Sequence, residues 1–223
     1  MAGFSLLALI FFALVSNLFV NTRIIVAGDV VKTAENILAH EKLFRAGIAC
    51  TLMMFNCDIV EAVALYILLK PVGKNLALLG MVWRFANACI GGSLTLGSFF
   101  ALRLAVTSGP LFGLSPVESR SLIMLFLDPS NEGGFICLTF FSFGMITHGY
   151  LFLKSNYIPR ILSGLYVFAA AVLLVGTFSL IVFPGITASI FPAYIIPDFL
   201  AELFLGLWLS IKGVKIPDHV MGS

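Results

Sequence analysis

The chain has 223 residues, of which 60% are hydrophobic and only 11% are charged, and its mean hydropathy is +1.08. A soluble domain of this length has far fewer apolar residues, so the composition indicates one integral membrane domain over residues 1–223. The formal net charge is +2, and Lys and Arg are scattered. We therefore expect the lipid bilayer, and not a nucleic acid, as the partner.

The first apolar run predicts a membrane helix over residues 4–20, because about 20 apolar residues cross a bilayer. No Lys or Arg precedes this run, and Asn21, Thr22 and Arg23 follow it. A signal peptide would have a basic start and small residues at its cleavage site. We therefore expect a retained helix rather than a cleaved leader.

Two amphipathic helices are predicted in the connections. Residues 30–40 follow Asp29, a good N-cap, and place their apolar side chains on one helical face. Residues 115–127 open with a capping box formed by Ser115 and Glu118. We expect both helices to be interfacial, the second lying on the bilayer or on the bundle. Covering a loop is the simpler role for each, and gating is the alternative.

The next two spans are predicted over residues 42–69 and 76–106. The Lys-Pro-Val-Gly-Lys sequence at residues 70–74 separates them. Pro and Gly stop helices and the two lysines mark a membrane surface, so this is a tight turn between antiparallel helices. The second span is too long to cross upright, and we expect it to tilt or to extend beyond the bilayer.

Three further spans are predicted over residues 135–153, 161–183 and 190–211. Pro192 falls near the first turn of the last span, and Pro197 is expected to kink it. The predicted fold class is therefore all-α: a polytopic bundle of about six transmembrane spans with two interfacial amphipathic helices.

An even number of spans puts both termini on one side of the membrane. That side and the opposite side each carry six basic residues, so the count alone gives no orientation. On the terminal side, however, most of these residues are concentrated on short turns. We therefore predict a multi-pass protein of the cell membrane with cytoplasmic termini.

Five ionisable residues lie inside the long apolar stretches: Asp58, Glu61, Arg84, His148 and Glu202. Ionisable groups within spans are costly, which makes them candidates for function. Counting about 1.5 Å per residue from the turns puts Glu61, Arg84 and Glu202 at one depth, roughly 15 Å from the turn side. Asp58 and Asn87 lie one helical turn beyond Glu61 and Arg84. We predict that Arg84 pairs with Glu61 or Asp58, with Glu202 within reach.

One Arg among two or three acids leaves an excess of negative charge at this depth. That excess predicts a carboxyl that stays protonated, or a bound proton or cation. A buried ion-pair network that only locks helix packing is the alternative, and the pattern favours neither. His148, near a span end, is expected to be a hydrogen-bonded packing residue.

We predict no cofactor and no metal site. His40 and His219 lie in a connection and in the tail, and the sequence has no HxxxH or HExxH motif; His148 with carboxylates is the remaining possibility for a metal. Cys50, Cys57, Cys89 and Cys137 form no CxxC motif and are expected to be small buried side chains. With no catalytic motif, no catalytic residue is assigned, and an enzyme is the less favoured class.

Four segments, in order along nearly the whole chain, carry a family resemblance: AGDVVKTAENILAHEKLFR, CDIVEAVALYILLKPVGKNLALLGMVWR, GYLFLKSNYIPRILSGLYVFAAA and AELFLGLWLSIKGVK. They resemble the small bacterial membrane proteins catalogued as domain of unknown function DUF4386. The resemblance implies a membrane fold and a bacterial source, and nothing about chemistry. Members usually begin with a basic stretch before the first span, so we expect a shortened or mis-started N-terminus here.

Three functions are compatible with these features. The leading hypothesis is a transporter-like protein, or one that binds protons or a small ligand, through Asp58, Glu61, Arg84, Asn87 and Glu202. The chain is short and shows no clear internal repeat, so such a protein could work as a homo-oligomer. The alternatives are an intramembrane enzyme acting on a lipid and a non-catalytic structural subunit. The sequence does not identify the small-molecule or lipid ligand.

Overall fold

The computed structural model describes residues 1–26, 28–106, 113, 115–127, 132–183 and 193–214. Within these ranges every regular element is helical, which confirms the all-α class. Five of the described stretches are long and apolar enough to cross a membrane: Ala2–Ile24, Glu41–Val106, Gly133–Ser155, Arg160–Val182 and Ala193–Ile211. The exposed surface of these helices is rich in large apolar side chains, as expected where lipid replaces water as the solvent.

The first stretch is one continuous helical run. It consists of α1 (Ala2–Leu14), a π-helical segment η1 (Val15–Asn21) and a short α2 (Thr22–Ile24). This confirms the helix predicted over residues 4–20. The hydroxyls of Ser16 and Thr51 lie 2.7 Å apart, and this hydrogen bond ties the π-helical segment to the following long helix.

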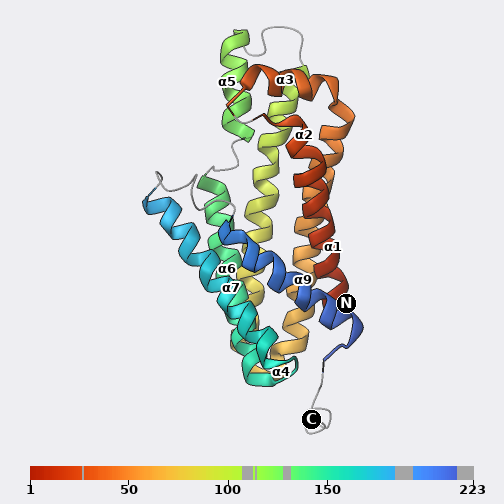
Figure 1. Ribbon diagram of the computed structural model, residues 1–223, viewed down its shortest axis with the longest axis vertical. Helices are drawn as coiled ribbons and strands as arrows, with labels where there is room; N and C mark the ends of the chain where they lie inside the picture. Colours follow the sequence, from red (N-terminus) through yellow and green to blue (C-terminus); the bar gives the residue numbers. More distant parts are fainter. Residues whose placement is uncertain (27, 107–112, 114, 128–131, 184–192, 215–223) are drawn as a thin grey trace.

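Helix α3 (Val30–Ala39) crosses the end of the bundle (Figure 1). The backbone N–H of Lys32 donates to Asp29 Oδ1 at 2.9 Å, which confirms the predicted N-cap. Only part of the predicted apolar face is buried: Ala34 and Ile37 pack inside, whereas Leu38 is 52% exposed.

Helix α4 (Glu41–Val106) contains two of the predicted spans. Its 66 residues are interrupted at Gly73, where φ is −175° and ψ is 88°. The helix doubles back there, so that its two arms run side by side (Figure 1). The break falls within the predicted turn at residues 70–74 and follows Pro71 closely.

Helix α5 (Pro116–Leu127) starts with the predicted capping box. The N–H of Ser115 donates to Glu118 Oε2 at 2.7 Å, and the N–H of Glu118 donates to Ser115 Oγ at 3.3 Å. The hydrogen bond from the Ser115 backbone lowers the pKa of the Glu118 carboxyl. The helix packs along the second arm of α4 (Figure 1), so of the two surfaces expected for it, bilayer or bundle, it contacts the bundle.

The last helices are α6 (Glu132–Ser155), α7 (Arg160–Val182) and α9 (Ile196–Ile211), the last preceded by a 3₁₀ turn, η4 (Ala193–Ile195). The kink predicted at Pro197 is wrong. Pro197 lies in the first turn of α9, where its missing N–H removes no helical hydrogen bond. Pro192 lies outside the described residues.

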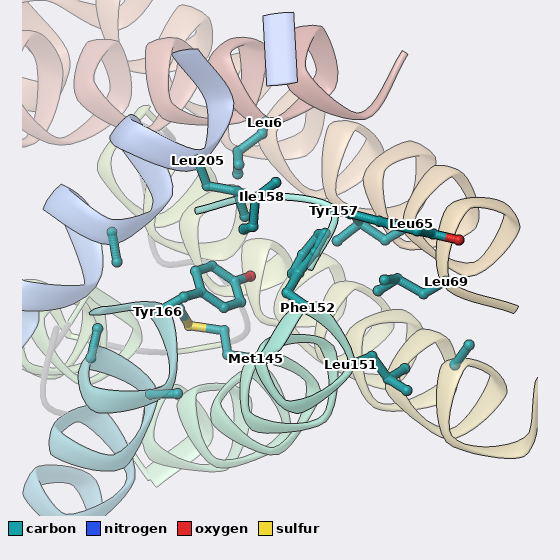
Figure 2. Close-up of a cluster of buried hydrophobic side chains, with 14 of the residues drawn as sticks. Leu6, Leu65, Leu69, Met145, Leu151, Phe152, Tyr157, Ile158, Tyr166 and Leu205 are labelled. Atoms are coloured by element: carbon teal, nitrogen blue, oxygen red, sulfur yellow. The ribbon is translucent and has the colours of Figure 1, made fainter. Parts of the chain in front are cut away.

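Two apolar clusters occupy opposite ends of the bundle. One, near the α6–α7 turn, contains Leu65, Leu69, Phe152 and Tyr166 among others (Figure 2). The other, beneath α3 and α5, contains Phe44, Ile48 and Leu102. Along both arms of α4, Asp58, Glu61, Arg84 and Asn87 fall between the residues of these clusters. The polar layer is therefore enclosed by apolar packing at both ends.

The two ends of the described chain meet at a close crossing of α1 and α9. A Cβ atom on Gly3 would lie 2.6 Å from the backbone nitrogen of Ser210 and 2.9 Å from the carbonyl oxygen of Gly206. Only glycine allows this approach, which holds α9 against α1. This contact fixes the position of the helix that carries Glu202.

Candidate functional site

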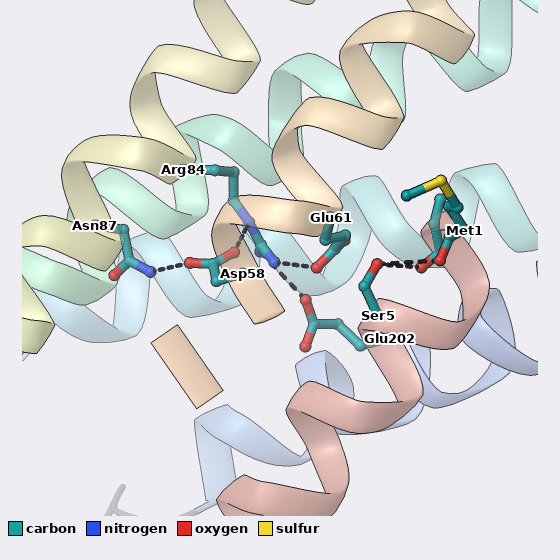
Figure 3. Close-up of polar contacts among 8 residues, drawn as sticks. Met1, Ser5, Asp58, Glu61, Arg84, Asn87 and Glu202 are labelled. Atoms are coloured by element: carbon teal, nitrogen blue, oxygen red, sulfur yellow. Dashed lines mark hydrogen bonds and ion pairs between the residues drawn. The ribbon is translucent and has the colours of Figure 1, made fainter. Parts of the chain in front are cut away.

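The candidate site is centred on the guanidinium of Arg84, which is completely buried. Its Nε lies 2.7 Å from Asp58 Oδ1, its Nη2 lies 2.6 Å from Glu61 Oε2, and its Nη1 lies 3.2 Å from Glu202 Oε1 (Figure 3). Each nitrogen therefore faces a different carboxylate. The planar, permanently charged guanidinium is well suited to join three acids in this way.

These residues meet because the two arms of α4 run antiparallel. Asp58 and Glu61 lie three residues apart on one face of the first arm, and Arg84 and Asn87 have the same spacing on the second. Asn87 Nδ2 donates to Asp58 Oδ2 at 2.7 Å, so both oxygens of Asp58 have partners. Glu202 approaches from α9. Arg84 was expected to pair with Glu61 or Asp58, with Glu202 within reach, and the structure shows contacts to all three.

Helix α6 provides the space for the Arg84 side chain. A Cβ atom on Gly144 would lie 2.8 Å from Arg84 Cγ, so a larger residue would displace the arginine. On the same helix, the ring of Phe141 lies with its centroid 4.0 Å from Arg84 Cζ. This cation–π contact covers one face of the guanidinium with apolar carbon.

His148 is buried next to this site, but its expected hydrogen bond is absent. Neither ring nitrogen has a hydrogen-bond partner among the described residues. The ring occupies the space left by a glycine, since a Cβ atom on Gly80 would lie 2.6 Å from His148 Nε2. His148 is therefore a packing residue between α6 and the second arm of α4 and does not contact the carboxylates directly.

Asp198 is a fourth buried acid that the sequence analysis did not select. It lies one turn before Glu202 on α9 and is only 9% exposed, and its Oδ1 has no hydrogen-bond partner in the described part of the chain. The spacing of four from Glu202 is the signal that could have identified it, because such residues share a helical face.

Tyr166 of α7 is a further buried polar residue of this region. It is fully buried, and within the described ranges its hydroxyl has no hydrogen-bond partner. The phenol points from α7 into the bundle interior (Figure 2). Arg84, Glu61, Glu202 and Asp198 are all near enough to act on it electrostatically.

The site contains four buried carboxyls and one buried guanidinium. If all were ionised, their formal charge would be −3, in surroundings that solvate charge poorly. Glu61 Oε1, the oxygen that is not paired with Arg84, has no hydrogen-bond partner among the described residues, as is the case for Asp198 Oδ1. The arrangement can therefore accept protons, and neutralising its acids would remove the excess charge.

No metal or cofactor is assigned to this site. In the residues that the structure describes, no group of three or more His, Cys, Asp or Glu side chains is arranged to hold a metal ion.

The four cysteines are not all buried as predicted: Cys137 is buried, Cys50 and Cys57 are half-buried, and Cys89 is exposed. In a membrane helix an apolar thiol can face lipid, so burial within the protein is not required.

Comparison with known proteins identifies a family. The model of the family described as "Domain of unknown function (DUF4386)" matches residues 1–213. A protein of Archaeoglobus fulgidus, described as "Uncharacterized protein", is 28% identical over 163 residues, which cover 73% of this chain and 81% of that protein. No solved structure matches the chain.

Proposed function

The chain belongs to the DUF4386 family, and we propose that it is a six-span membrane protein of transporter type that binds protons at the buried cluster around Arg84. The observation that carries this proposal is the imbalance of charge in the cluster. Asp58, Glu61, Glu202 and Asp198 are each 9% exposed or less, with one arginine among them.

Protons are the ligand that this geometry favours. The cost of several like charges in a buried site is relieved when some carboxyls are neutral. A proton needs no cavity, and these side chains are closely surrounded by apolar packing. Midplane acids of this kind commonly form proton relays in transporters. The cluster would thus retain at least one proton at neutral pH.

The six crossings follow from counting each arm of α4 as one span. Lys70, Lys74, Lys154, Arg160 and Lys212 are exposed at the end where α4 and the α6–α7 connection turn. No acidic residue accompanies them among the described residues of that end. The abundance of basic residues on short connections supports cytoplasmic termini.

Cysteine labelling tests this topology. In a variant without the four native cysteines, Lys74→Cys should react with a membrane-impermeant thiol reagent from the cytoplasmic side, and Arg23→Cys only from the opposite side. Helix α2, which carries Arg23, and the turn of α4, which carries Lys74, lie at opposite ends of the bundle (Figure 1), and both residues are exposed. Labelling of both from the same side would show that the count of six crossings is wrong.

Proton flux into liposomes tests the transporter assignment. Reconstituted wild-type protein should acidify vesicles that contain a pH-sensitive dye when a membrane potential draws protons inward. Glu202→Gln should reduce this flux strongly, because it removes an acid that contacts Arg84. Glu41→Gln is the matched control, since Glu41 forms only an exposed pair with Arg45. Wild-type flux equal to that of empty liposomes would refute transport.

One observation favours a second candidate, the structural subunit. All three guanidinium nitrogens of Arg84 are paired with carboxylates from two helices, as in a cluster that locks packing. In that case Glu202→Gln would lower stability, while wild-type liposomes would show no proton flux. The flux assay therefore separates the two functions.

A further inference from the structure

We propose that the exchangeable proton of the cluster is held on α9, by the pair of carboxyls formed by Asp198 and Glu202, with Asp198 as the group that loads it. This inference rests on the proposed proton binding and assigns it to named residues. The four buried acids differ in the number of partners that their carboxyl oxygens have. Asp58 accepts a hydrogen bond from Asn87 and forms an ion pair with Arg84, and Glu61 and Glu202 each form an ion pair with Arg84.

Asp198 has no such compensation. None of its described contacts is an ion pair, and Oδ1 has no hydrogen-bond partner within the described residues. It shares a helical face with Glu202, one turn away, so the two carboxyls repel each other when both are ionised. Protonation of Asp198 relieves this repulsion without disturbing the contacts of Arg84.

The groups that face Asp198 from the neighbouring elements agree with this assignment. From α4 the nearby group is the cation Arg84, which is itself engaged with three other carboxylates. From α7 the facing group is Tyr166, whose buried hydroxyl has no partner in the described part of the chain and lies within electrostatic range of Asp198. Tyr194 of η4 lies beside the start of α9. Helix α1 contributes no titratable side chain to this packing.

Exposure identifies which of the two acids exchanges protons with the surroundings. Asp198 is 9% exposed, compared with 4% for Glu202, 1% for Asp58 and 0% for Glu61. The α9 start is therefore the most accessible point of the cluster. In the transfer step, the O–H bond of the Asp198 carboxyl breaks as one forms on a Glu202 carboxylate oxygen. This leaves Asp198 ionised and able to bind the next proton.

Infrared spectroscopy of the purified protein in lipid nanodiscs tests the assignment. At pH 7 the wild type should show the carbonyl stretch of a protonated carboxyl, with the small shift expected in heavy water. Asp198→Asn should lose the intensity of one carboxyl from this band. Asp198→Glu, which keeps the acid, should retain the intensity at a displaced frequency, and Glu41→Gln should match the wild type.

The outcomes distinguish this inference from the proposed function. Full band intensity in Asp198→Asn, combined with loss in Asp58→Asn or Glu61→Gln, would overturn the assignment to α9 while leaving proton binding intact. Absence of the band from the wild type would refute proton binding itself. Loss of folding in Asp198→Asn does not prevent the test, because a band in Asp198→Glu identical in frequency to the wild-type band would also overturn the assignment.

Discussion

Replacement of Arg84 by alanine is expected to destabilise the protein by about 3–5 kcal/mol at pH 7, the usual effect of removing one partner from a buried ion pair. The side chain is fully buried and contacts Asp58, Glu61 and Glu202, all of which lose their cation. Unfolding of the wild type and of Arg84→Ala in detergent micelles, followed by circular dichroism, measures the difference.

The defect of Arg84→Ala should shrink as the pH falls. Without the arginine, the folded variant relieves the repulsion among its acids by binding protons that the unfolded chain does not hold at pH 7. Where the folded state binds more protons than the unfolded state, stability decreases as pH rises. The penalty is therefore full at neutral pH and disappears below about pH 4, where unfolded carboxyls are also protonated.

The control for this prediction is Arg45→Ala. Arg45 Nε lies 2.7 Å from Glu41 Oε1 in an exposed pair between residues four apart on the same helix. Such a pair contributes only about 0.3–0.5 kcal/mol, so the variant should be nearly as stable as the wild type. If the Arg84→Ala defect stays constant or grows toward low pH, Arg84 does not compensate buried acids.

The positions of the membrane helices could be predicted because lipid imposes a simple rule. A span needs a long apolar run, and the runs at residues 4–20, 135–153 and 161–183 match observed helices closely. The turn at residues 70–74 was predictable from Pro and Gly. The orientation of α5 was not, because its apolar residues can pack equally well against lipid or against the second arm of α4.

Much of the candidate site was also predictable, from depth alone. Residues at equal distances from turns on the same side must lie at similar levels, which brings Glu61, Arg84 and Glu202 together. Depth does not determine which side chains touch once helices tilt. The position of the His148 ring depends on the space beside Gly80. The burial of Asp198 depends on where α9 begins and how it packs. These are properties of packing and not of periodicity.

The proton count on unfolding tests the central claim most directly. Purified protein in weakly buffered micelles at pH 7 is unfolded with a strong denaturant, and an indicator dye reports the protons exchanged. Unfolded carboxyls are ionised at this pH, and the histidines and cysteines together contribute less than about half a proton. We predict the release of at least one proton per chain, and one fewer from Asp198→Asn than from the wild type. No release, or net uptake, would show that the buried acids around Arg84 are already ionised in the folded protein.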